Sequence, residues 1–164
     1  MLGSFKDWTA VYKECFRCLK PGGYLEHVEC GTHVLSDDGS LPADSAWADW
    51  KRIFSEASEK TGRTFDIIDD DRWVGWMKEA GFGGEGAAEI KTRVVKTPIG
   101  AWPAEAKWKE VGLFKKLGLE RGLEGFGLYI LTSVMGWQYE EVQSWLARVR
   151  DVLKNKSIHS YSSW

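Results

Sequence analysis

The stretch "CLKPGGYLEHVEC", Cys18 to Cys30, joins two different sequence patterns. Before it, between Ser4 and Leu19, apolar residues recur at the three- and four-residue spacing of one helical face. Pro21 cannot continue a helix, and the two glycines after it allow a tight turn. The short run Tyr24–Cys30, bounded by glycine on both sides, then predicts a strand. A helix, a sharp turn and a strand form half of an α/β crossover unit.

The remaining chain predicts further helices and strands without an internal repeat or a linker, so residues 1–164 are expected to form one domain. A polar loop is expected over residues 31–44. Helices are expected from Asp44 or Ser45 to before Gly62, from Asp69–Asp71 to Ala80, from about Ala104 to Val134 with glycine interruptions, and from Glu140 to Leu153. Strands are expected over Ala87–Thr97 and, beginning near the end, in "SIHSYSSW".

Composition narrows the classes of partner. The 22 basic and 24 acidic residues leave a net charge of −2. The sequence therefore lacks the excess of positive charge that is typical of proteins that bind nucleic acid or acidic membranes. No stretch approaches the roughly 18 apolar residues of a membrane span. The three cysteines suggest no disulfide framework and no zinc site, which favours a reduced, intracellular location, cytoplasmic or nuclear. Small molecules or proteins are the expected partners.

"GFGGEG", Gly81 to Gly86, matches the G-x-G-x-x-G pattern of dinucleotide sites. In such sites the glycines follow a strand and open a helix, so that the helix N-terminus faces the pyrophosphate. Here a predicted helix precedes the glycines and a predicted strand follows them. The pattern is therefore interpreted as a loop that ends a helix, and no cofactor-binding residue is assigned.

Glu29 and His33 are the first candidates for a site, because ligands of open α/β sheets bind outside the carboxyl ends of parallel strands. Ordinary loop hydrogen bonding and a role in substrate contact or general-base chemistry both remain open for them. No ligand spacing for a metal is found. Trp102, in a loop between glycine and proline, is a candidate pocket wall or lid. Trp47 and Trp50 have core spacing.

The passage from helix through "LKPGG" to a strand ending in Glu29 resembles the region around the fifth strand of class I S-adenosylmethionine-dependent methyltransferases. Further motifs strengthen the resemblance, among them "MLGSFKDW", "SDDGSLPADSA", "K.PIG.WP" and "SIHSY". Together they look like the LaeA-like methyltransferases of filamentous fungi, which are found widely around secondary metabolism. The resemblance runs from Met1 to Tyr161.

The resemblance implies an α/β fold: a partial Rossmann-like methyltransferase sheet made of the C-terminal strands, with an antiparallel strand at its end and an inserted helical cap. It implies methyl transfer from S-adenosylmethionine to a small-molecule or protein acceptor. The family's main cofactor-binding motifs precede the position of Met1, so the chain is expected to be a truncated C-terminal half that is inactive alone. The resemblance places Glu29, His33, Trp47 and Trp102 around the acceptor. It assigns no catalytic residue.

Two alternatives stay open. The chain can be a non-catalytic interaction module that completes its sheet against a partner chain, or self-associates, through a cut sheet edge. It can also be an α/β domain in which the "LKPGG" passage is only architecture. An active methyltransferase is expected to bind S-adenosylmethionine unaided, whereas a chain of either alternative kind is expected not to bind it.

Overall fold

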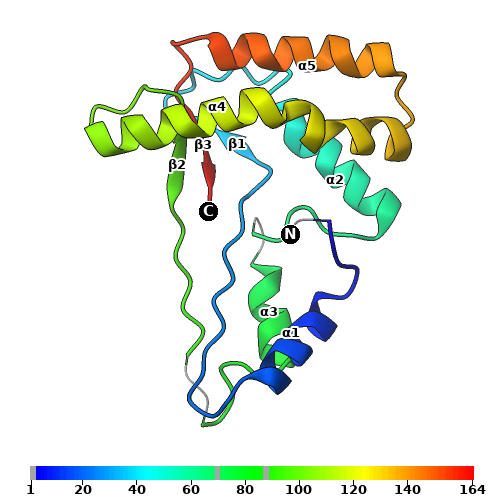
Figure 1. Ribbon diagram of the computed structural model, residues 1–164, viewed down its shortest axis with the longest axis vertical. Coiled ribbons are helices and arrows are strands. Elements are labelled where there is room, and N and C mark those ends of the chain that lie inside the picture. The colour runs from blue at the N-terminus through cyan, green and yellow to red at the C-terminus, as the bar shows by residue number, and fades with distance from the viewer. Residues whose placement is uncertain (1–2, 69–70, 87–88) are drawn as a thin grey trace.

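The computed structural model describes residues 3–68, 71–86 and 89–164 (Figure 1). Five α-helices, a π-helical turn and three short strands alternate along these residues. In chain order the elements are α1 (Trp8–Cys18), β1 (Val34–Leu35), α2 (Asp49–Thr61), α3 (Arg72–Glu79), β2 (Lys96–Ile99), α4 (Ala106–Tyr129), η1 (Ile130–Val134), α5 (Tyr139–Lys154) and β3 (Ser160–Ser163).

The sheet has the strand order β1-β3-β2, and both pairings are antiparallel. Val34 lies opposite Ser162 in one pair, and Thr97 lies opposite the same serine in the other. Backbone hydrogen bonds continue this pattern by one step, from Gly31 N to Ser163 O and in both directions between Val95 and Trp164. Because β3 runs against both neighbours, β1 and β2 run parallel to each other on either side of it.

Two strand predictions and the expected sheet are corrected by this topology. Tyr24–Cys30 forms no strand, and neither does the described part of Ala87–Thr97 before Lys96; residues 87–88 lie outside the described residues. A strand requires a neighbour that binds its backbone N–H and C=O groups, and β3 reaches only to Gly31 and Val95. The antiparallel strand lies in the middle of the described sheet instead of at its end, and no two described strands pair in parallel. The Rossmann-like sheet with an inserted helical cap stays a prediction.

Each predicted helix is present and has local signals at its ends, but α2 begins at Asp49 and not at Asp44 or Ser45, because residues 43–48 form turns. The Asp7 side chain accepts a hydrogen bond from Ala10 N at the start of α1, and Gly62, at φ +64°, ends α2. A capping box between Gln138 and Glu141 opens α5. Asp71, at φ 54°, precedes α3 and makes no side-chain cap; the other two aspartates of the predicted start lie outside the described residues.

The predicted interruption of the long helix by glycine is wrong. α4 continues through Gly118, Gly122 and Gly125, and the chain then passes into the π-helical turn η1. A glycine costs a helix interior only about 1 kcal/mol relative to alanine, which tertiary packing can offset. The helical region ends near Gly136, whose φ is +80°.

The buried apolar side chains form two separate clusters. The larger cluster, called here the major core, lies among α2, α4, η1 and α5. The smaller one, called the minor core, lies between α1 and α3 and is built on Trp8, Tyr12, Ile67, Met77 and Ala80. In the view of Figure 1 helices α2, α4 and α5 lie at the top and α1 and α3 at the bottom, with extended segments of the chain running between them.

Candidate functional site

Three loops from distant parts of the sequence lie together at one end of the strands. Residues 36–42 follow β1, residues 100–103 follow β2, and residues 155–159 lead into β3. Since β1 and β2 are parallel and β3 is antiparallel between them, the carboxyl ends of two strands and the amino end of the third meet here. This end of the sheet is called the rim below. Open parallel α/β sheets bind their ligands outside the carboxyl ends of their strands.

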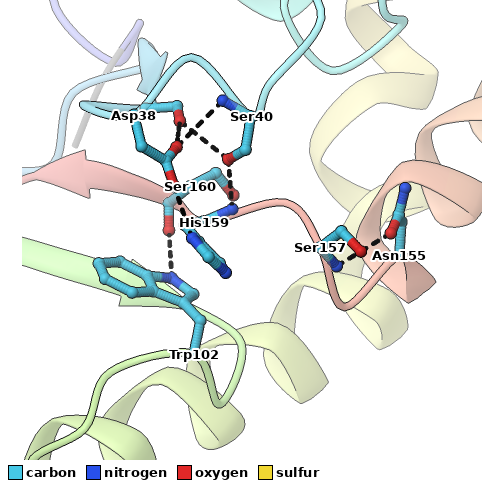
Figure 2. Close-up of polar contacts among 8 residues, drawn as sticks. Asp38, Ser40, Trp102, Asn155, Ser157, His159 and Ser160 are labelled. Atoms are coloured by element: carbon cyan, nitrogen blue, oxygen red, sulfur yellow. Dashed lines mark hydrogen bonds and ion pairs between the residues drawn. The ribbon is translucent and has the colours of Figure 1, made fainter.

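A hydrogen-bond network centred on Asp38 fixes two of these loops to each other (Figure 2). Asp38 Oδ1 accepts hydrogen bonds from Ser36 Oγ at 2.7 Å and from the backbone N of Ser40 at 3.0 Å. Its other oxygen lies 2.6 Å from His159 Nδ1, and His159 N donates to Ser40 Oγ at 2.7 Å. Hydrogen bonds from Ser40 and Ser36, followed by that from His159, hold the pKa of Asp38 well below its usual range.

Trp102 joins the third loop to this network. Its Nε1–H donates to Ser160 O at 3.0 Å, and its ring stacks on that of His159 with centroids 5.5 Å apart. The loop itself lies directly on α4: a Cβ placed on Gly112 would be 2.0 Å from Gly100 O. Only glycine at position 112 permits this approach. The indole is thus held from two sides while part of its surface faces solvent.

A pocket of about 180 Å³ opens beside Trp102. Its walls are mainly apolar, and the polar side chains at its border include two lysines but no carboxylate. The lining residues are Trp47, Ile99, Gly100, Ala101, Trp102, Leu113, Lys116, Val152, Leu153, Asn155, Lys156, Ile158 and Ser160. Apolar walls with a few polar groups are typical of a small-molecule site.

The structure brings together two of the four candidates expected around an acceptor. Trp47 is buried in the major core, as its spacing predicts, and one face of it also lines the pocket. Trp102 forms the opposite, partly exposed wall. That this pocket holds a substrate stays a prediction.

Glu29 and His33 do not line this pocket. Glu29 Oε2 lies 3.9 Å from His27 Nε2, beside the minor core, where Tyr12 Oη and His27 Nδ1 are 2.7 Å apart. Burial alone would raise the pKa of Glu29, but His27 and the backbone N–H of Cys30 outweigh it and lower the pKa to about 2. His33 Nδ1 lies 3.4 Å from Lys51 Nζ of α2.

Sequence reasoning missed Asp38, Ser40 and His159 as neighbours of Trp102. His159 is not among the candidates named from the sequence, and residues 31–44, which include Asp38 and Ser40, are predicted only as a polar loop. Asp38 and His159 are 121 residues apart in the sequence. Their proximity depends on β3 pairing with β1, and no local pattern encodes that pairing.

The glycine-rich segment does not form the phosphate-binding turn of a dinucleotide site. "GFGGEG" follows α3 and lies in turns, with positive φ at Gly81, Gly83 and Gly86, and no helix opens from it. The interpretation as a helix-ending loop is confirmed. Within the same residues no group of three or more His, Cys, Asp or Glu side chains is arranged to hold a metal ion. Among the helices described, none has the length and apolar content to cross a membrane.

Comparison with known proteins identifies the class to which the chain is related: fungal proteins named as methyltransferases or as regulators of secondary metabolism. It is 36% identical over 160 residues to methyltransferase pytC of Aspergillus terreus, covering 98% of this chain and 47% of pytC. It is 33% identical over 155 residues to the probable methyltransferase tdiE of Emericella nidulans, covering 94% of this chain and 47% of tdiE.

The secondary metabolism regulator LAE1 of Cochliobolus heterostrophus is 31% identical over 163 residues, which cover 98% of this chain and 51% of LAE1. The resemblance to LaeA-like methyltransferases is thus confirmed by homologues that align over nearly the whole chain. The chain spans about half the length of the curated relatives it matches. No protein-family model matches the chain, and no solved structure does.

Proposed function

We propose that the chain is the acceptor-binding portion of a methyl-transferring protein, and that the pocket beside Trp102 holds the methyl acceptor. The observation that carries the proposal is the position of this pocket at the rim, in a homologue of proteins named methyltransferases. In methyl transfer most of the catalysis is the positioning of donor and acceptor, which a walled pocket provides.

A small-molecule acceptor fits the pocket better than a protein does. A volume of about 180 Å³ accommodates a compact ring system or a single side chain, but no length of folded polypeptide. Trp102 offers one aromatic face, Trp47 forms part of the wall, and Lys116 and Lys156 provide positive charge at the border. A planar, anionic molecule of the secondary-metabolite kind meets all these features.

The donor implied by the homologues is S-adenosylmethionine. Because the one G-x-G-x-x-G match of the sequence ends a helix instead of opening one, we propose that this chain alone does not bind the donor and does not transfer a methyl group. Its own contribution is to orient the acceptor, with Trp102 as the wall and the Asp38–His159 pair as the support that fixes this wall.

Two calorimetric titrations test the proposal, after circular dichroism has shown that the purified chain is folded. The first uses S-adenosylmethionine, for which no heat of binding is expected; binding in the micromolar range would overturn the inactive-alone proposal. The second uses indole-3-acetate as a planar anionic probe, with uncharged indole-3-acetamide as its match. We expect the acetate to bind, and Trp102→Leu to weaken it about tenfold, which is about 1.4 kcal/mol.

Lys109→Gln is the matched control for that second titration, since Lys109 is an exposed lysine of α4 that does not line the pocket. Equal affinity for acetate and acetamide, or an unchanged affinity of Trp102→Leu, would remove the pocket from the proposal.

A second candidate function is a binding module that completes its sheet against a partner chain. It is favoured by residues 24–28 and 89–94, which lead toward the sheet on either side of β3 but form no strands in the described structure. Tyr24, Val28 and Val94 of these segments are exposed. Extended backbone outside a sheet, with exposed apolar side chains, is a template for strand addition.

Hydrogen exchange measured by mass spectrometry tests this candidate on the same chain. Amides of residues 24–28 and 89–94 are expected to exchange fast in dilute solution and those of β3 slowly. If both segments are already protected in dilute monomer, no edge is open to a partner and the second candidate fails.

A further inference from the structure

Helix α4 is apolar on two opposite faces. Its inner face buries Gly112, Leu123 and Gly127 against the rest of the molecule. Its outer face exposes Phe114, at 68%, and Leu117, at 40%. The helix has 24 residues and is therefore about 36 Å long, and in Figure 1 it crosses in front of the sheet. Large apolar side chains exposed among charged ones are typical of a protein–protein contact surface.

The outer face carries a regular stripe. Starting at Lys107, residues that follow at alternating intervals of three and four lie on one side of the helix, opposite the buried glycines, which is the spacing of a coiled-coil seam. These residues, called the α4 stripe, are Lys107, Glu110, Phe114, Leu117, Arg121 and Glu124. All are exposed except Glu124, which is partly buried.

The order of side chains along the stripe is positive, negative, apolar, apolar, positive, negative. The midpoint of the stripe lies between Lys115 and Lys116. In an antiparallel pair of α4 helices, each residue meets the one equally far beyond this midpoint. Phe114 then faces Leu117 of the second copy, Glu110 faces Arg121, and Lys107 faces Glu124. We propose that α4 forms an antiparallel, two-fold symmetric contact with a second copy of this chain through the α4 stripe.

The symmetry makes every favourable pair occur twice. A two-fold axis gives an isologous contact, in which residue i of one copy touches residue j of the other and j touches i. The contact would therefore contain two Phe114–Leu117 pairs at its centre, two Glu110–Arg121 pairs next to them, and two Lys107–Glu124 pairs outside. Gly118 beside the centre leaves room for the rings, since nothing lies within 4 Å of a Cβ placed there.

A second copy fits this stripe better than an unrelated helix, because the charge order is complementary to its own reverse. A parallel arrangement of two copies would instead place Glu110 opposite Glu110 and Arg121 opposite Arg121, and like charges in contact are unfavourable. Glu124 remains compatible with the contact: its Oε1 accepts a hydrogen bond from Gln143 Nε2 at 3.1 Å, which fixes the carboxylate near the surface.

Sedimentation velocity on the full chain tests the proposal over a concentration series from about 1 µM to about 1 mM, which spans the affinities of weak dimers. A monomer–dimer equilibrium is expected. Phe114→Lys is expected to abolish the dimer. Glu110→Arg and Arg121→Glu are each expected to raise the dissociation constant at least about tenfold, because each places like charges opposite one another twice.

The double variant Glu110→Arg with Arg121→Glu is the decisive one, because it restores opposite charges in both copies and is expected to recover dimerisation. Phe126→Ser is the matched control, since Phe126 is an exposed aromatic of α4 outside the stripe, and it is expected to sediment as the unchanged chain does. Circular dichroism confirms that each variant is folded.

Three results would overturn the proposal. One is a monomer at every concentration. Another is a dimer that tolerates Phe114→Lys, which would place the contact on another surface, such as the extended segments 24–28 and 89–94. The third is a double variant no better than the single ones, which would show that Glu110 and Arg121 do not face each other.

Discussion

The major and minor cores differ in how their helices are held. In the major core α2, α4 and α5 pack directly on one another, and residues such as Ile53, Leu146 and Val149 are almost completely buried. In the minor core α1 and α3 contact each other, and the remaining contacts come from irregular segments such as the one around Ile67. The stability of the major core is therefore shared among many side chains, whereas the stability of the minor core depends on few.

Both cores contain buried indole N–H groups without a hydrogen-bond partner: Trp47 and Trp145 in the major core, and Trp8 and Trp73 at the minor core. Burying an unsatisfied polar group costs about 1–3 kcal/mol. Because the minor core has fewer buried apolar side chains to offset this cost, we expect it to open at a lower free energy than the major core.

Leu146→Ala is expected to have the largest effect. Leu146 is 0% exposed within the major core, and removing a buried leucine side chain costs about 3 kcal/mol or more when the cavity does not collapse. Urea unfolding followed by circular dichroism measures the loss. Tyr129→Ala is the control, since Tyr129 is largely exposed on α4 and should change the free energy of unfolding by less than about 0.5 kcal/mol. A small loss for Leu146→Ala would mean that the major core repacks freely.

Met77→Ala tests whether the two cores unfold separately. Met77 is buried between α3 and α1, and its truncation should cost about 2 kcal/mol. Hydrogen exchange is expected to accelerate in α1 and α3 while α5 keeps its protection. Equal acceleration in α5 would show one cooperative unit and remove the distinction between the cores.

Prediction from sequence succeeded where the information was local. The helices were found because most of them bury one periodic stripe and carry their own end signals, such as Pro21 after α1 and Gly62 after α2. Core positions such as Trp50, Ile53 and Val149 follow from the same periodicity. These features depend only on residues a few positions apart.

The strand predicted within "SIHSYSSW" is confirmed as β3, but its central position and the rim depended on distant pairing and were missed. β3 is the central strand, yet its sequence, Ser160-Tyr161-Ser162-Ser163, lacks the alternating apolar pattern of a buried strand. Conversely, Tyr24–Cys30 has strand-like composition but forms no strand with the described part of the chain. Trp47 and Trp102 were named as candidates, but their shared pocket and the Asp38–His159 contact required the three-dimensional arrangement.

Lys115 provides a test of the polar contacts between α4 and the sheet. Its Nζ donates to Thr97 O at 3.2 Å and to Ser162 Oγ at 2.5 Å. Burial lowers its pKa from 10.5 to about 8, although Cys30 acts in the opposite direction. Between these two pH values the unfolded chain binds a proton that the folded chain does not, so stability rises with pH.

The expected rise is roughly 2 kcal/mol between about pH 8 and pH 10.5. Urea unfolding at both pH values measures it, and subtracting the same measurement on Lys115→Met cancels the tyrosines and cysteines that titrate in this range. Lys109→Met, an exposed lysine of the same helix, should keep the full rise. A rise that persists in Lys115→Met would assign it to another group.

The smallest effect is expected at the rim, which lies at the border of the major core. Trp102→Phe removes the hydrogen bond from Nε1 to Ser160 O and keeps an aromatic ring that can stack on His159. Since the indole is partly exposed, water can replace the lost donor at the carbonyl, and a loss of about 0.5–1 kcal/mol in the free energy of unfolding is expected. Trp102→Leu, which also removes the stack, should cost somewhat more. If Trp102→Phe instead lowered the free energy of unfolding by more than about 2 kcal/mol, the rim loop would be as important for folding as the side chains of the major core. A small loss supports a role of the rim loop in binding, because a pocket wall that contributes little to the free energy of unfolding is able to adjust to a ligand.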